Sequence, residues 1–280
     1  MKFAPWLAAG VLAAATLAAV PALASPAVTP APSVKVHGMR AAHVQIPSEV
    51  LPSLKPAAVV QSSNWSGYAA LPVKGQTMRY VAADFTIPSV VCGTLGNSGD
   101  AVDSTWVGLD GYSDTTVEQT GTDAICSGGT PAYYAWYEMY PLAPVLFTGV
   151  SPGDAIVVSV LHTTGSTYAL SLTDVTTGSV IDTTQACPAG STCRNESAEV
   201  ISEVTGGGPP VVDLPNFGMT NFIGTGVTTT SVHRGPISAG PYWTSSEIVM
   251  EDSSNADHLM SQPDTLWGGR AFSTTWKASS

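Results

Sequence analysis

The spacing of apolar residues after residue 61 constrains the fold of this chain most strongly. Short stretches of alternating apolar and polar residues recur between turn signals, and no window keeps the period of a helix. Because alternate residues of a strand face opposite sides of a sheet, this pattern predicts half-buried β-strands. The expected strands cover residues 79–87, 104–109, 133–140, 155–161, 168–173, 199–204 and 246–250.

Many short strands with Gly and Pro turns and no helix are typical of an all-β domain. We predict a two-sheet antiparallel β-sandwich of the concanavalin-like jelly-roll type, formed by residues 61–280. Thr177-Gly178 marks a hairpin turn between strands at 170–173 and 180–183. Such strands can enclose a full core between two sheets that pack about 10 Å apart.

The first 24 residues have the pattern of a secretory signal peptide. Lys2 precedes a short apolar run at 7–20, and Ala22-Leu23-Ala24 forms an A-x-A cleavage site. This run is too short for a membrane anchor, and no later segment approaches the length of a transmembrane helix. We therefore expect a secreted, extracellular protein that is not held in a membrane.

Residues 25–60 differ in composition from the rest of the chain. They are rich in Pro, and their charged residues are mostly basic, with Glu49 as the one acid. This composition suits a disordered linker, and it also suits a pro-segment. As a pro-segment, it would dock on the acidic body at neutral pH and let go when carboxylates become protonated.

The remainder of the chain is strongly acidic. After residue 61 there are 6 Lys and Arg residues against 20 Asp and Glu residues. A chain with this balance offers no binding surface for the phosphates of a nucleic acid, which excludes that class of partner. The few basic residues limit charge repulsion at low pH and favour function in acid, although a generic extracellular surface has the same balance.

Four cysteines remain in the exported part of the chain: Cys92, Cys126, Cys187 and Cys193. An even number in a secreted protein predicts two disulfides, for which three pairings are possible. The short spacing of the last two favours the pairs 92–126 and 187–193. A zinc site is a weaker alternative, because the spacing lacks C-x-x-C and no pair of histidines lies nearby.

Familiar hydrolase signatures are absent, apart from a G-x-S-x-G pattern at 149–153. Pro152 has no N–H for an oxyanion and no helix follows it, so we interpret that pattern as a turn. Polar groups suited to acid–base chemistry instead lie in segments 106–121, 134–141 and 193–203. Alternation along a strand predicts shared faces for these groups: Trp106 with Asp110; Trp136 with Glu138 and Tyr140; Glu199 with Glu203.

These segments resemble the glutamic peptidases, or eqolisins, over roughly residues 62–277. The resemblance rests on several motifs in the same order and at similar spacing. They are Asn-Trp-Ser-Gly at 64–67, Trp-Val-Gly-Leu-Asp-Gly at 106–111, Gln-Thr-Gly at 119–121, Ala-Trp-Tyr-Glu-Met-Tyr-Pro at 135–141, and Cys-Arg followed by Ala-Glu-Val-Ile-Ser-Glu, at 193–194 and 198–203.

The resemblance implies a β-sandwich peptidase that is made as a precursor and works in acid. It also implies that Gln119 and Glu203 are the catalytic residues. The chain departs from the family pattern at Met139, where the family has Trp, and at Tyr134, where the family often has an acid. These departures bear on substrate preference and on the pH optimum.

The chemistry of a Glu and Gln pair indicates hydrolysis of peptide bonds by an activated water. The Glu203 carboxylate would accept a proton from the water, and the Gln119 amide would orient the water and donate to the oxyanion. Such a site requires no metal and no cofactor. We expect polypeptide substrates, a monomeric enzyme, and a role in substrate binding or positioning for four further residues: Trp106, Asp110, Trp136 and Glu138.

Two alternatives from other classes fit the same fold. A jelly-roll glycosidase would use Glu138 and Glu203 as paired carboxylates, with Trp residues stacking on sugars. A lectin-like binding module would need neither Gln119 nor Glu203. Glu118 is excluded as a catalytic residue because its side chain is expected on the face opposite to Gln119.

Overall fold

The computed structural model describes residues 57–93, 100–205, 213–252 and 255–279. The predicted signal peptide (1–24) and all but the last four residues of the predicted pro-segment or linker (25–60) lie outside this part of the chain. Within it, the first strand already begins at Ala57, before the expected start of the domain at residue 61.

The described residues form sixteen strands and no helix. The strands are β1 (Ala57–Ser62), β2 (Trp65–Pro72), β3 (Met78–Thr86), β4 (Asp100–Leu109), β5 (Val117–Ser127), β6 (Thr130–Tyr140), β7 (Val145–Phe147), β8 (Ala155–His162), β9 (Thr167–Asp174), β10 (Ser179–Ala186), β11 (Ala198–Glu203), β12 (Met219–Thr229), β13 (Arg234–Pro236), β14 (Trp243–Asp252), β15 (Asn255–Pro263) and β16 (Phe272–Trp276). Among these residues there is accordingly no helix with the length and apolarity to cross a membrane.

The strands that alternation predicted are all present, and several others were missed. The hairpin of β9 and β10 is confirmed, with Asp174 paired to Ser179. β2 and β5 escaped prediction because nearly every residue in them is buried, on both faces of the sheet. A strand covered on both sides shows no alternation of polar and apolar residues, so its sequence carries little period-two signal.

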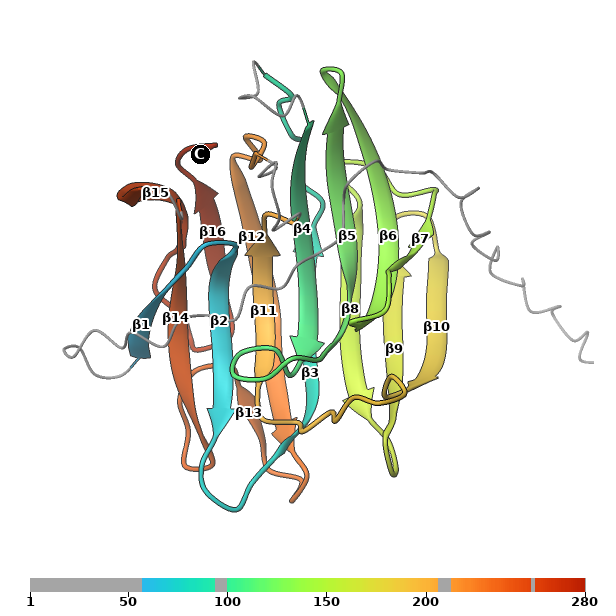
Figure 1. The fold of residues 1–280 in the computed structure, drawn as a ribbon, viewed down its shortest axis with the longest axis vertical. Coiled ribbons are helices and arrows are strands. Elements are labelled where there is room, and N and C mark those ends of the chain that lie inside the picture. The colour runs from blue at the N-terminus through green and yellow to red at the C-terminus, as the bar shows by residue number, and fades with distance from the viewer. Residues whose placement is uncertain (1–56, 94–99, 206–212, 253–254, 280) are drawn as a thin grey trace, which may run out of the picture.

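The strands form one hydrogen-bonded sheet that folds over into two layers (Figure 1). One layer contains β10, β9, β8, β3, β12 and β16, and the other contains β14, β2, β11, β4, β5, β6 and β7, with β15 joining β16 to β14. β4 lies against β3 and β8, and β5 lies against β8 and β9. This arrangement confirms the predicted β-sandwich. Every pairing between its strands is antiparallel except that of β1 with β14.

The main core lies between the two layers. Aromatic residues form its centre, where Phe222 stacks on Phe272 with ring centroids 4.8 Å apart. Tyr68 of the facing layer meets Phe272 edge to face at 4.8 Å. Burying such rings removes a large apolar area from water and holds the layers together. The opposite face of the β2–β11–β4–β5–β6 layer therefore points away from the core, and the catalytic candidates lie there.

Two disulfides have the predicted pairing. Cys92 is bonded to Cys126, with Cα atoms 5.5 Å apart, and so links the segment after β3 to the end of β5. Cys187 is bonded to Cys193, with Cα atoms 6.0 Å apart, and closes the loop that leads from β10 into β11. The described residues contain no free cysteine, which sets aside the zinc alternative.

Candidate active site

A second apolar cluster covers the outer face of the β2–β11–β4–β5–β6 layer. Three tryptophans, Trp65, Trp106 and Trp136, lie in it together with Ile201. Trp65 and Trp106 meet edge to face, with ring centroids 5.1 Å apart. Glu203 lies two residues after Ile201 on β11 and is paired with Trp65. Gln119 lies two residues before Gly121, which is paired with Trp106 and Trp136, so both side chains share this face.

Glu203, the last residue of β11, is buried and has a donor at each carboxylate oxygen. The side-chain amide of Asn64 donates to Oε1 at 2.9 Å. The indole Nε1 of Trp106 donates to Oε2 at 2.8 Å. Hydrogen bonds of this kind favour the ionised form of a carboxylate and fix its orientation.

Gln119 lies on β5 directly opposite Glu138 of β6. Its Nε2 donates to Oε2 of Glu138 at 2.5 Å, and both side chains are buried. Because a carboxylate only accepts, this bond determines which end of the Gln119 amide is nitrogen. The neighbouring Glu118 points to the other side of the sheet, as expected, where it interacts with Asp110.

The strand register puts the two catalytic candidates at different levels of the outer face. Glu203 is paired with Ser104 of β4, whereas Gln119 is paired with Gly108 of that strand. The Trp106 indole lies between these levels. Its Nε1 reaches Glu203, and its far edge lies beside Gly108, where an added Cβ would meet both Cζ3 of Trp106 and Cβ of Gln119. The indole therefore extends from the Glu203 carboxylate to the region of Gly108, beside Cβ of Gln119.

A glycine is required at one position of the Gln-Thr-Gly motif. An added Cβ at Gly121 would collide with the backbone oxygen of Thr105 and with Cβ of Trp106. The missing side chain of Gly121 thus lets β5 pack closely against β4 at Thr105 and Trp106. A side chain at position 121 would therefore disturb the pairing of β5 with β4 beside Gln119.

Asp123 is a further acid on the same face, four residues after Gln119. Ser104 donates to its Oδ1 at 2.6 Å, and Ser104 is the β4 partner of Glu203. The pKa of Asp123 is raised to about 7, mainly by burial; hydrogen bonds from Ser104 and Trp136 oppose the shift, and the charges of Glu138 and Glu203 add to it. Asp123 is therefore protonated and neutral at pH values well below 7.

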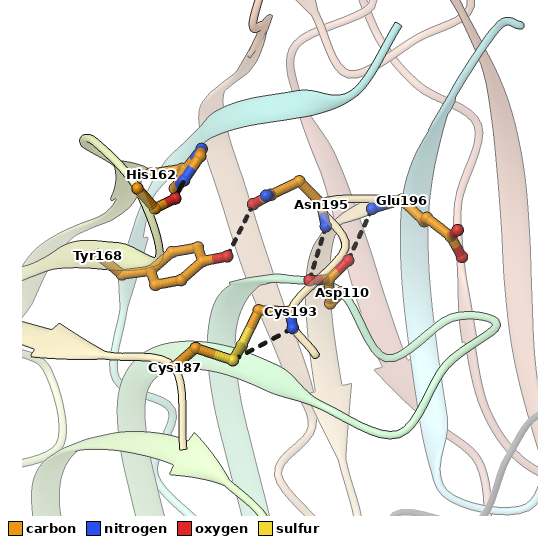
Figure 2. Close-up of a disulfide and its surroundings, with 8 residues drawn as sticks. Asp110, His162, Tyr168, Cys187, Cys193, Asn195 and Glu196 are labelled. Carbon is orange, nitrogen blue, oxygen red and sulfur yellow. Dashed lines mark hydrogen bonds between the residues drawn. A yellow bond between two sulfur atoms is a disulfide. The ribbon is translucent and has the colours of Figure 1, made fainter. Parts of the chain in front are cut away.

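Asp110 does not share a face with Trp106, and that expectation from strand alternation was wrong. Asp110 follows the last residue of β4 and has a φ of 68°, a left-handed conformation that breaks the alternation. Its carboxylate accepts the backbone N–H of Asn195 at 2.8 Å and of Glu196 at 2.6 Å (Figure 2). Asp110 thereby holds the segment that leads into β11.

Figure 2 shows how this support is connected to the core and to the disulfide. The Tyr168 hydroxyl, which lies within the core between the layers, donates to Oδ1 of Asn195 at 3.1 Å. The Cys187–Cys193 disulfide ends two residues before Asn195. The segment before β11 is thus held by Asp110, by Tyr168 and by the disulfide. Glu203 lies at the far end of the strand that follows.

Several acids around this support are neutral at low pH. The pKa of Asp114 is raised to about 7, mainly by burial and next by the charge of Asp110. Burial also raises the pKa of Glu118 and of Glu199 well above its usual range, with Asp110 again contributing.

The loop that holds Asp114 crosses in front of β11 and β2 in Figure 1, and its Tyr112 donates to Ser246 of β14 at 3.1 Å.

The site combines residues that the motifs predicted with two that they did not. Trp106, Trp136 and Glu138 lie on the outer face with Gln119 and Glu203 as expected. Asn64 and Asp123 were missed. Two sequence signals point to them: Asn64 belongs to the Asn-Trp-Ser-Gly segment, and Asp123 lies at even spacing from Gln119.

Comparison with known sequences gives a consistent result. A profile of the Peptidase A4 family matches residues 63–260. The chain is 33% identical over 197 residues to aspergillopepsin-2 of Aspergillus niger, across 64% of this chain and 68% of that protein. It is 32% identical over 145 residues to scytalidopepsin B of Scytalidium lignicola, across 50% of this chain and 52% of that protein.

Solved structures show the same similarity in three dimensions. A crystal structure of scytalido-glutamic peptidase with a peptide-based transition-state analogue matches with a TM-score of 0.61 and 26% identity, covering 77% of this chain and 99% of that chain. The crystal structure of aspergilloglutamic peptidase from Aspergillus niger matches with a TM-score of 0.53 and 26% identity, covering 63% and 99%.

Proposed function

The chain belongs to the Peptidase A4 family, the glutamic peptidases, and we propose that Glu203 and Gln119 together activate the water with which it cleaves peptide bonds. The protein is a glutamic endopeptidase, so the glycosidase and lectin alternatives are set aside. The assignment of the pair rests on the position of the Trp106 indole. Its Nε1 donates to the Glu203 carboxylate, and its far edge lies beside Gly108, the strand partner of Gln119, on the same buried face.

The proposed reaction uses the two residues in different ways. The Glu203 carboxylate accepts a proton from the attacking water and later returns it to the leaving amine. The Oε1 of Gln119 orients the same water. Of the two N–H groups of its amide, one is donated to Glu138, and the second is the proposed donor to the oxyanion.

The remaining residues of the site would support this pair. Glu138 holds the Gln119 amide in one orientation, and Trp106 holds the Glu203 carboxylate. Trp136 lies in the tryptophan cluster, where an apolar wall suits contact with a substrate side chain. Asp110 acts at a distance, because its carboxylate holds the backbone that leads into β11.

We further propose that the enzyme is secreted as a precursor and works in acid as a monomer. The signal-peptide pattern at 1–24 and the basic composition of 25–60 support export and a pro-segment. Neutral buried acids such as Asp123 support a working range below about pH 7, because their ionisation would place new charge beside the site.

Casein digestion by the purified protein without its signal peptide tests the proposal. We expect cleavage near pH 3 that weakens toward pH 7 and that continues with EDTA and pepstatin present. Glu203→Gln should lower kcat by at least about 1,000-fold, and Gln119→Ala by about 100- to 1,000-fold. Cleavage that survives Glu203→Gln would overturn the assignment of the base.

Matched variants separate loss of chemistry from loss of folding. Glu196→Gln changes an acid near β11 whose side chain reaches solvent, and it should keep wild-type activity. Circular dichroism of each variant at the assay pH shows whether the fold is retained. A requirement for a pro-segment is tested by removing residues 25–56 before the assay.

A further inference from the structure

We propose that Asn64 is a positioning residue of this peptidase: it clamps the Glu203 carboxylate, together with Trp106, in the orientation that accepts a proton from water. This inference rests on the proposed role of Glu203 as the base. Asn64 lies just before β2, whose first residue, Trp65, is paired with Glu203. It reaches Glu203 from the side opposite to β4, which holds Trp106.

The orientation of the Asn64 amide is determined by Ser62. The Ser62 hydroxyl oxygen accepts the backbone N–H of Asn64 at 3.3 Å and of Trp65 at 3.0 Å. Its proton is therefore directed elsewhere, to Oδ1 of Asn64 at 3.1 Å. With its oxygen engaged in this way, the amide presents its NH₂ group to Oε1 of Glu203.

The backbone adds a second connection between the two residues. The carbonyl oxygen of Asn64 accepts the N–H of Val204, the residue after Glu203, at 3.0 Å. Ser62, Asn64 and Glu203 are all buried, with exposed fractions of 4%, 5% and 2%. A buried side chain that is tied at both its backbone and its amide has little freedom to turn, so Glu203 is held by a rigid group.

The clamp has a chemical consequence for the base. One N–H donor on each oxygen stabilises the carboxylate anion. Each oxygen keeps a second lone pair, which can accept a further hydrogen bond. Removing one donor makes the carboxylate harder to ionise and freer to rotate. Asp123 of β5 interacts electrostatically with both Glu203 and Glu138. Because its charge would also change the titration of Glu203, every variant in the test keeps Asp123.

The test compares Asn64→Leu, which keeps a similar volume without a donor, with the wild type and with Asn221→Leu. Asn221 is an exposed asparagine of β12 in the other layer, so its variant is the matched control. We expect Asn64→Leu to lower kcat about 10- to 100-fold with little change in KM, and to move the acid limb of the kcat profile upward by about 1 pH unit.

A spectroscopic measurement follows the carboxyl group directly. In protein labelled with ¹³C at Glu Cδ, the resonance that disappears in Glu203→Gln belongs to Glu203. The midpoint of its titration should rise in Asn64→Leu by about the same 1 pH unit, and Asn221→Leu should leave it in place. A role of Asn64 in packing alone would lower stability without moving this midpoint.

Ser62→Ala provides a second variant if Asn64→Leu fails to fold by circular dichroism. It keeps the amide but removes the hydroxyl that orients it, so a smaller shift in the same direction is expected. The double variant Asn64→Leu with Glu203→Gln should be no less active than Glu203→Gln alone, since Asn64 acts through Glu203.

The outcomes separate this inference from the function on which it rests. If Glu203→Gln is inactive while Asn64→Leu keeps the wild-type midpoint and acid limb, the clamp is wrong and the proposed base stands. If Glu203→Gln remains active, the proposed base fails, and the positioning role of Asn64 fails with it.

Discussion

The indole Nε1 of Trp106 donates a hydrogen bond to Oε2 of Glu203 across 2.8 Å, so a β4 tryptophan supports a β11 acid. The same ring packs edge to face on Trp65, and its outer edge lies beside Gly108 of β4. Trp106 thus serves both as an apolar wall and as a polar donor.

Trp106→Phe should separate these two functions. Phe keeps much of the apolar ring but has no N–H, so one oxygen of Glu203 loses its donor. We expect kcat to fall about 10- to 100-fold, the range typical of one hydrogen bond to a charged group. Trp243→Phe removes an indole N–H from the core, where Trp243 donates to the Ser238 carbonyl, and should leave kcat unchanged. Equal loss in both variants would contradict the role of the Trp106 donor.

Asp123→Asn tests whether this acid is neutral in the working enzyme. Because the pKa of Asp123 is raised to about 7, the wild-type side chain is uncharged at pH 3–5, and an amide of the same shape should preserve activity there. Above that range the wild-type carboxyl ionises beside Glu203, whereas the amide of the variant stays neutral. We expect the variant to keep activity to a higher pH than the wild type in a casein assay; a large loss at pH 3 would show that the acid proton itself is needed.

The stability of the protein should be highest in acid and fall as the pH rises. The folded-state pKa is raised by burial for Asp103, Asp114, Glu118, Asp123 and Glu199, so the folded state binds more protons than the unfolded chain above about pH 4. The free energy of unfolding therefore decreases from about pH 4 through pH 7, where Asp114 and Asp123 ionise. Thermal unfolding followed by circular dichroism between pH 3 and 8 measures this slope.

Glu118→Gln is the matched variant for that slope. Glu118 is buried beside Asp110 and faces away from the catalytic side of the sheet, so its removal leaves the chemistry in place. Gln does not titrate, and the fall in Tm with rising pH should become shallower than in the wild type. An unchanged slope would mean that Glu118 ionises normally in the folded protein.

The two disulfides should differ in their effect on stability. Cys92–Cys126 closes a loop with a sequence separation of 34, and Cys187–Cys193 one with a separation of 6. Chain entropy predicts a loss of about 4 kcal/mol for the first and about 2 kcal/mol for the second in the free energy of unfolding. Denaturant unfolding of the paired Cys→Ser variants measures both. The second variant should also lower activity, because its loop leads into β11.

Much of the fold class follows from the order of amino acids alone. Alternation and the absence of a helical period were sufficient for an all-β sandwich, because a half-buried strand leaves a period-two pattern in its own residues. The pairing of Cys187 with Cys193 followed from their short spacing. The motifs around Gln119 and Glu203 were likewise visible, because they include residues such as Gly121, where close packing of the neighbouring strand leaves no room for a side chain.

The geometry of the site depended on contacts between residues far apart in the chain. Asn64 and Glu203 meet because β2 pairs with β11, a register that no local pattern encodes. The left-handed turn at Asp110 sends its carboxylate to Asn195, against the alternation that the strand before it suggests. Strand periodicity reports which face of a sheet a side chain occupies, but strand order and register decide which side chains become neighbours, and they are set by the packing of the whole sandwich.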